Sequence, residues 1–94
     1  MDKATFLAKI SEEIASLKAE LGQDAILDCR AVKTIGAFEE SEVFALNELD
    51  ELWNWLNTAY AEGDTPDEWF VDIYENIPED KSAYYTGNTI WFDE

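Results

Sequence analysis

The sequence contains no histidine, a single cysteine and only six lysine or arginine residues. The absence of histidine removes the usual general base, a common metal ligand, and the Ser/His and Cys/His schemes of nucleophilic catalysis. The sequences GxxxxGK[ST], GxGxxG and CxxC are missing as well, as is the ligand order of a calcium-binding EF-hand loop. We therefore expect a protein that is not an enzyme and has no catalytic residues, metal site or cofactor.

Long apolar runs are also missing, and the N-terminus does not have the layout of a signal peptide. A lone cysteine, Cys29, cannot form an internal disulfide bond, which is consistent with a reducing cytosol. The 94 residues are 47% hydrophobic and 14% aromatic, which is too rich for a disordered chain. We expect one folded acidic domain over residues 1–94, located in the cytoplasm.

Basic residues are scarce, and their distribution along the chain is uneven. The formal net charge is −16, and residues 34–94 contain sixteen acidic residues and one basic residue, Lys81. Solubility requires far less charge, and self-repulsion on this scale destabilises a compact state. Such a chain is repelled by nucleic acid and by anionic membranes, and it is attracted to basic proteins. The distribution favours an acidic surface that faces a partner.

The first half of the chain predicts a helix, a strand and an ambiguous segment. A helical stripe of apolar residues predicts a helix over 4–21, with Gly22 at its C-terminal cap. Residues 24–35 alternate as a strand, with Cys29 on the more apolar side as a buried thiol. Residues 42–46 form either a second strand, paired across a turn at 39–41, or the front of a long helix running to Ala61. Asn47 is a good N-cap, which favours the strand followed by a helix that begins at Asn47 and stops at Gly63.

The second half predicts another helix and a hairpin. Thr65-Pro66-Asp67-Glu68 is a helix start signal, and Pro78 disfavours helical geometry in the residue before it. Residues 83–85 and 89–92 flank Thr86-Gly87-Asn88, which is typical of a β-hairpin turn. The order α-β-β-α-α-β-β predicts an α+β domain in which an antiparallel sheet packs with three helices.

The two helices predicted after Asn47 would each present a row of carboxylates. Side chains one helical turn apart lie about 5–6 Å from each other along the axis, comparable with neighbouring phosphates on a nucleic-acid strand. The alternative is an ordinary solvated helix face, although no lysines are interspersed to relieve the repulsion. Trp55 lies on the first row, either covered by a loop or by the hairpin, or exposed as an anchor for a partner. The candidate partner-binding residues are Glu48, Glu51, Trp55, Glu62, Asp67, Glu68, Asp72, Glu75 and Glu79.

In size, charge and element order, the chain resembles the small acidic DNA-mimicking anti-CRISPR and antirestriction proteins of phages and other mobile elements. The run Asp72-Ile-Tyr-Glu-Asn-Ile-Pro-Glu79 is similar to an acidic stretch in ArdA-type antirestriction proteins, over eight residues. The run Leu49-Asp-Glu-Leu-Trp53 is similar to part of the inhibitor helix of barstar-like nuclease inhibitors. Both resemblances imply acidic proteins that occupy nucleic-acid-binding sites.

These observations lead to three functional hypotheses. The first is a non-enzymatic inhibitor that mimics nucleic acid and blocks the DNA- or RNA-binding site of a defence complex, such as a CRISPR effector or a restriction enzyme. The second is an immunity-type antitoxin that neutralises a basic nuclease. The third is a structural or assembly protein whose acidic surface only confers solubility. Under the first two, we expect a monomer or homodimer whose partner is a basic nucleic-acid-binding protein, with no direct binding to nucleic acid or to membranes.

Overall fold

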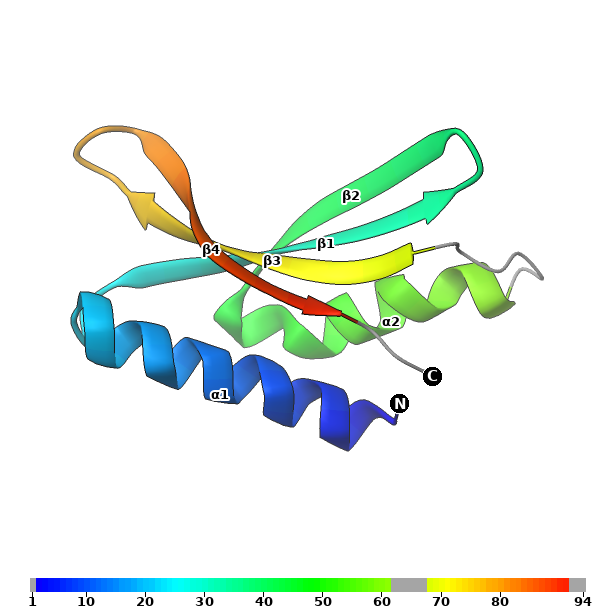
Figure 1. Cartoon of the computed structure of the whole chain (residues 1–94), viewed down its shortest axis with the longest axis horizontal. Helices are drawn as coiled ribbons and strands as arrows, with labels where there is room; N and C mark the ends of the chain where they lie inside the picture. The colour runs from blue at the N-terminus through cyan, green and yellow to red at the C-terminus, as the bar shows by residue number, and fades with distance from the viewer. Residues whose placement is uncertain (1, 62–67, 92–94) are drawn as a thin grey trace.

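Four antiparallel strands form one sheet, and two α-helices pack on one of its faces, in a computed structural model that describes residues 2–61 and 68–91 (Figure 1). The elements are α1 (Lys3–Leu21), β1 (Ile26–Ile35), β2 (Phe38–Ala45), the 3-10 turn η1 (Leu46–Glu48), α2 (Leu49–Ala61), β3 (Glu68–Ile77) and β4 (Ser82–Trp91). The strand order across the sheet is β2-β1-β3-β4. The predicted α+β class with an antiparallel sheet is confirmed. None of the described helices is long and apolar enough to cross a membrane.

The first helix follows the prediction closely. Asp2 caps α1, since its carboxylate accepts a hydrogen bond of 2.8 Å from the backbone N–H of Thr5. At the other end, Gly22 has φ +116° and donates its N–H to the carbonyl of Lys18. A glycine adopts this left-handed backbone without the clash that a Cβ would cause. The apolar stripe of α1 packs its side chains against the sheet.

The ambiguous segment before Asn47 is a strand, and the alternative of one long helix is wrong. The turn between β1 and β2 lies earlier than predicted, at Gly36 and Ala37, because Gly36 supplies the positive φ (+61°) that a two-residue hairpin turn needs. Residues 39–41, predicted as the turn, are therefore part of β2. Asn47 lies within η1, where Glu48 accepts a hydrogen bond of 2.9 Å from the N–H of Ala45. The helix itself begins at Leu49, and the predicted stop at Gly63 lies outside the described residues.

The helix predicted between Thr65 and Pro78 is wrong, because this segment forms the central strand β3. Its side chains alternate: Trp69, Val71 and Ile73 are buried beneath the helices, and the residues between them lie on the opposite face. β-Branched and aromatic residues in this alternation favour a strand. The start signal at Thr65, Pro66 and Asp67 lies outside the described residues. The domain therefore has two α-helices in the described part, where three were predicted.

The predicted C-terminal hairpin is also wrong, because residues 82–91 form the single strand β4. Tyr85 pairs with Tyr74 and Thr89 with Asp72, so that three residues of β4 oppose one residue of β3 in a bulge. Gly87, at φ +90°, makes the bulge possible. The hairpin that exists joins β3 to β4 through residues 78–81.

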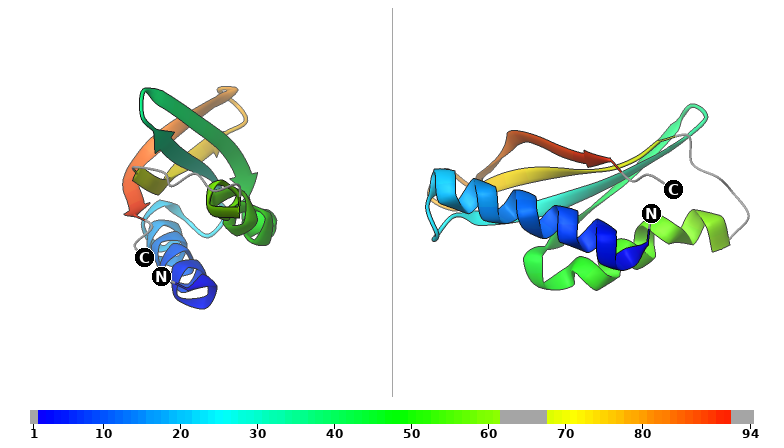
Figure 2. Two further views of the ribbon diagram at one scale, coloured as in Figure 1. Left: turned by 90° about the vertical axis from the view of Figure 1, so that its right-hand side faces the viewer. Right: turned by 60° about the horizontal axis from the view of Figure 1, so that its bottom comes forward.

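The two faces of the sheet have different environments. Both helices lie on the same side, which we call the covered face, and the other side has no helix over it in the described part (Figures 1 and 2). We call the latter the open face. The core fills the space between the covered face and the helices, and its members are Phe6, Ile10, Leu17, Leu27, Cys29, Ala31, Phe44, Leu52, Leu56, Trp69, Val71, Ile73 and Ile90. The burial of Cys29, with no exposed surface, confirms the prediction of a buried thiol.

Candidate functional site: an acidic edge on β2 and α2

The second of the two predicted acidic rows does not exist. On a strand, Glu68 and Asp72 lie on the open face, whereas Glu75 lies on the covered face and Glu79 lies in the turn after β3. Moreover, the side chain of Asp72 is only 14% exposed. It accepts a hydrogen bond of 2.7 Å from Thr89. Of the other candidates, Glu62 and Asp67 lie outside the described residues.

The first predicted row is retained in part, because Glu48, Glu51 and Trp55 lie on one side of the η1–α2 segment. Trp55 shows which side this is. Its ring lies 6.3 Å from the ring of Phe44 on β2, and the ammonium group of Lys33 on β1 lies 4.5 Å from its centroid. The row therefore faces the β2 edge of the sheet. Trp55 is half-buried against β1 and β2. Its position therefore matches neither of the two alternatives, which were cover by a loop or the hairpin and exposure as an anchor.

The other side of α2 faces α1. Trp53 lies 5.6 Å from Phe6 between ring centroids, and Asp50 forms an ion pair of 2.9 Å with Lys3. Leu52 and Leu56 are fully buried against the sheet. The acidic residues of α2 are thus divided, with Asp50 neutralised toward α1 and Glu51 directed toward β2.

Strand β2 contributes three further glutamates that the sequence prediction missed. Glu39, Glu40 and Glu42 are all exposed on this edge strand. The strand leads into η1, and α2 then runs back beneath β1 and β2 (Figure 1). Five exposed carboxylates therefore lie along the β2 edge of the molecule, and we call this group the acidic edge: Glu39, Glu40, Glu42, Glu48 and Glu51. The register places Glu39 on the open face of the sheet, and Glu40 and Glu42 on the covered face.

Few basic groups neutralise the acidic edge. The guanidinium of Arg30 lies 3.3 Å from Glu39, and the ammonium of Lys33 lies 4.0 Å from Glu40. The carboxylate of Glu48 accepts a hydrogen bond from the backbone N–H of Ala45, which carries no charge. The side chains of Glu39 and Glu40 nevertheless remain 57% and 66% exposed, so a partner has access to both.

A signal for the missed glutamates was present in the sequence. Phe38 and Phe44 are six positions apart, an even number, and Glu40 and Glu42 are also even positions between them. A strand beginning at Phe38 places these four side chains on one face. The three consecutive polar residues at 39–41 favour a turn instead. The choice between a turn there and a strand through these residues is settled only by the turn at Gly36 and Ala37.

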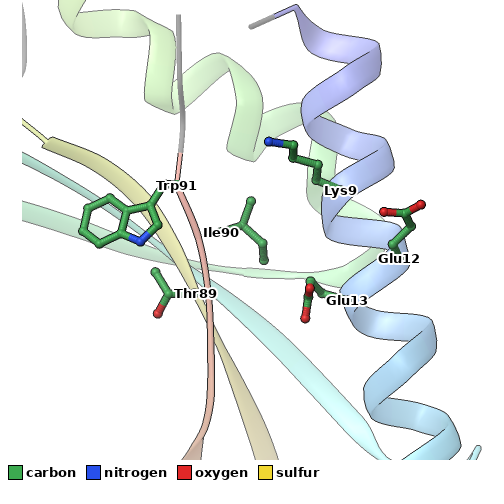
Figure 3. A pocket seen from close by; sticks show the side chains of 6 residues that line it. All are labelled: Lys9, Glu12, Glu13, Thr89, Ile90 and Trp91. Atoms are coloured by element: carbon green, nitrogen blue, oxygen red, sulfur yellow. The ribbon is translucent and has the colours of Figure 1, made fainter.

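A hollow of about 370 Å³ lies between α1 and β4, and Figure 3 shows its lining. Lys9, Glu12 and Glu13 of α1 line it opposite Thr89, Ile90 and Trp91 of β4. The carboxylate of Glu13 accepts a hydrogen bond of 2.9 Å from the amide of Asn88, which joins the two elements. This contact fixes the end of β4 against α1.

The remaining candidate for chemistry is the thiol of Cys29. Burial, with a smaller contribution from the neighbouring Asp28, raises its pKa to about 12, so the thiolate needed for nucleophilic attack or metal binding does not form at neutral pH. Within the ranges 2–61 and 68–91, no three histidine, cysteine or acidic side chains are grouped closely enough to hold a metal ion.

No protein-family model, curated protein or solved structure matches this chain. The candidate site therefore rests on its own geometry, which is a cluster of accessible carboxylates on a rigid strand and helix.

Proposed function

We propose that the protein is a non-enzymatic inhibitor that mimics nucleic acid with the acidic edge and blocks the DNA- or RNA-binding site of a defence complex, of the anti-CRISPR or antirestriction kind. The main supporting observation is the gathering of exposed carboxylates along the β2 edge and the η1–α2 segment, namely Glu39, Glu40, Glu42, Glu48 and Glu51. On this proposal the protein acts in the cytoplasm of a bacterial host, where such complexes meet foreign DNA.

The spacing of the carboxylates supports mimicry. Glu40 and Glu42 are two residues apart on one face of a strand, which separates their Cα atoms by about 7 Å. Glu48 and Glu51 are three apart on a helical segment, with Cβ atoms about 5–6 Å apart. These separations are comparable with those of successive phosphates, so a groove that places lysines and arginines for a nucleic-acid backbone offers partners for several of them.

The framework beneath the acidic edge also supports the proposal. β2 pairs with β1 over its whole length, and α2 is fixed by the buried Leu52 and Leu56. Charges held on regular elements do not need to be ordered when the partner binds, so more of the electrostatic attraction is retained in the binding free energy.

A competition experiment tests this function. Purified RNA-guided effectors and restriction complexes are incubated with labelled target DNA, and the protein is added at increasing concentration. We expect DNA to be displaced from at least one complex. The triple variant Glu40→Gln, Glu42→Gln, Glu51→Gln should displace it about tenfold less well or worse, if each lost charge-assisted contact contributes roughly 1 kcal/mol.

The matched control removes the same number of charges elsewhere. Glu12, Glu20 and Glu79 are exposed and lie outside the acidic edge. Their triple glutamine variant should retain displacement close to that of the parent. Equal losses in the two triple variants would mean that net charge, rather than the acidic edge, causes the displacement. Displacement of DNA from no complex, with tight binding to a basic nuclease, would favour the antitoxin hypothesis instead.

A further inference from the structure

The open face of the sheet exposes aromatic rings in a region that no described helix covers. Phe70 of β3 packs on Trp91 of β4 with ring centroids 4.9 Å apart, and Tyr74 packs on Tyr85 at 5.6 Å. Trp91 and Tyr85 are about half exposed, at 51% and 50%. Val43 of β2, at 61%, and Ile26 of β1, at 49%, are exposed on the same face. The register places Asp72 and Thr89 between the two ring pairs, so polar side chains border this exposed apolar surface, as they border interaction sites in soluble proteins.

A hollow of about 250 Å³ opens on this face, and one residue from each of β2, β3 and β4 lines it together with two from β1. Asp28 and Arg30 come from β1, Val43 from β2, Tyr74 from β3 and Ala83 from β4. The register places Asp28 directly beside Tyr74. The hollow therefore combines a carboxylate, a guanidinium group, an aromatic ring and two small apolar side chains.

Arg30 is already engaged within the protein. Its guanidinium lies 3.3 Å from Glu39 and 3.7 Å from Asp72. Asp28, in contrast, receives one hydrogen bond of 3.3 Å from the neutral amide of Asn76. Since a carboxylate has about four acceptor sites, Asp28 retains capacity for a charged donor.

The charge of the whole open face is negative. Asp28, Glu39, Glu68 and Asp72 lie on it, and Arg30 is the one basic residue that the register places there among the described strands. A second copy of this chain, with a net charge of −16, would be repelled, and so would nucleic acid. The complementary occupant is a cationic protein segment.

We infer that the hollow formed by Asp28, Arg30, Val43, Tyr74 and Ala83 binds an arginine side chain from a basic segment of a partner protein. The guanidinium donates to the Asp28 carboxylate and lies against the ring of Tyr74, and its aliphatic stem contacts Val43 and Ala83. Arginine fits better than lysine, because its planar group stacks on an aromatic ring while it donates hydrogen bonds in that plane. The inference extends the proposed function to a second contact surface but does not depend on the acidic edge.

The test is an NMR titration of the intact protein with a synthetic peptide of alternating arginine and glycine. A second peptide replaces arginine by citrulline, which keeps the shape of the side chain and removes its charge. We expect the arginine peptide to shift the amide signals of Asp28, Val43 and Tyr74. The citrulline peptide should bind at least about tenfold more weakly, the loss of one charge-assisted hydrogen bond.

Two variants locate the site. Asp28→Asn removes the charge with little change in shape, and Val43→Lys places a like charge at the rim on an exposed position of an edge strand. Both should weaken binding of the arginine peptide about tenfold or more, whereas Asp80→Asn, in the exposed β3–β4 turn, should not. The spectra of the free proteins show whether each variant is folded.

Several results would overturn the inference. One is a set of peptide-induced shifts confined to the acidic edge, abolished in the Glu40, Glu42 and Glu51 triple variant and unaffected by Val43→Lys. Another is equal affinity for the citrulline peptide. A third is broadening of the open-face signals with protein concentration alone, which would identify a homodimer interface. The proposed inhibitor function is tested separately, because it depends on displacement of DNA rather than on this hollow.

Discussion

The contact between Lys33 and Trp55 predicts a measurable coupling beneath the acidic edge. Lys33 is the one charged side chain that is buried in the described part of the chain, at 4% exposure. Its ammonium group donates a hydrogen bond of 3.2 Å to the carbonyl of Trp55 and lies 4.5 Å from the centroid of the ring of the same residue. We predict that this cation–π contact contributes about 1 kcal/mol to the free energy of unfolding, within a range of about 0.5–2 kcal/mol.

A double-mutant cycle isolates the contact with the ring. Trp55→Leu removes the ring and leaves the backbone carbonyl in place, so the hydrogen bond from Lys33 remains. Lys33→Met removes the charge and approximately preserves the volume of the side chain. Trp55→Leu alone should cost about 2 kcal/mol, less than a fully buried tryptophan, because the ring is half-buried against Phe44.

Urea unfolding of the parent, both single variants and the double variant gives the coupling energy, provided that the m-values agree. Far-UV circular dichroism is the suitable probe, because the substitution removes a fluorophore. The double variant should be more stable, by the coupling energy, than the sum of the two losses predicts. Losses that add within about 0.3 kcal/mol would refute the reasoning, since independent sites behave in this way.

Three further predictions concern the bulge, the buried thiol and the net charge. Gly87→Ala should lower the free energy of unfolding by about 1–2 kcal/mol in urea. The cause is backbone strain, because φ at Gly87 is +90°, although no atom lies close enough to clash with an added Cβ. Unchanged stability would mean that the bulge is not maintained. The pKa of the Cys29 thiol is about 12 in the fold against an ordinary value of 9.0, so the thiol of the unfolded chain ionises first as the pH rises. Above pH 9 the free energy of unfolding should therefore fall by about 1.4 kcal/mol per pH unit, relative to the variant Cys29→Ala. Parallel pH profiles of the two proteins would contradict the burial of the thiol. Added salt should raise the melting temperature, because it screens the repulsion among the carboxylates of a chain with a net charge of −16. Excess chelator should leave unfolding cooperative, whereas loss of the fold in chelator would show a structural metal.

The parts of the fold that the sequence predicts well are those with one polar and one apolar face. Helix α1 is of this kind, with its cap at Gly22 marking where it ends, and so is strand β1, with Cys29 on its covered side. β3 is different, because the open face bears Phe70 and Tyr74 where a solvated face would bear polar residues. With aromatic residues on both faces, the twofold alternation is masked, and the same residues also satisfy helical spacing.

The candidate site could be predicted only in part for a related reason. Glu48 and Glu51 share a line that follows from helical spacing alone. Glu40 and Glu42 join them only through the pairing of β2 with β1 and the return of α2 beneath the sheet, which are long-range contacts that no local pattern encodes. Gly87 similarly favours a turn by its local chemistry, whereas pairing with β3 converts that signal into a bulge.

The salt dependence of binding tests the central claim most directly. The affinity of the protein for a complex from which it displaces DNA is measured over a series of salt concentrations, for the parent and for the Glu40, Glu42 and Glu51 triple glutamine variant. If these carboxylates occupy phosphate sites, the affinity of the parent should fall steeply as salt rises, and the variant should show both weaker binding and a smaller slope. Equal slopes for the two proteins, or an affinity of the parent that does not change with salt, would contradict mimicry of nucleic acid by the acidic edge.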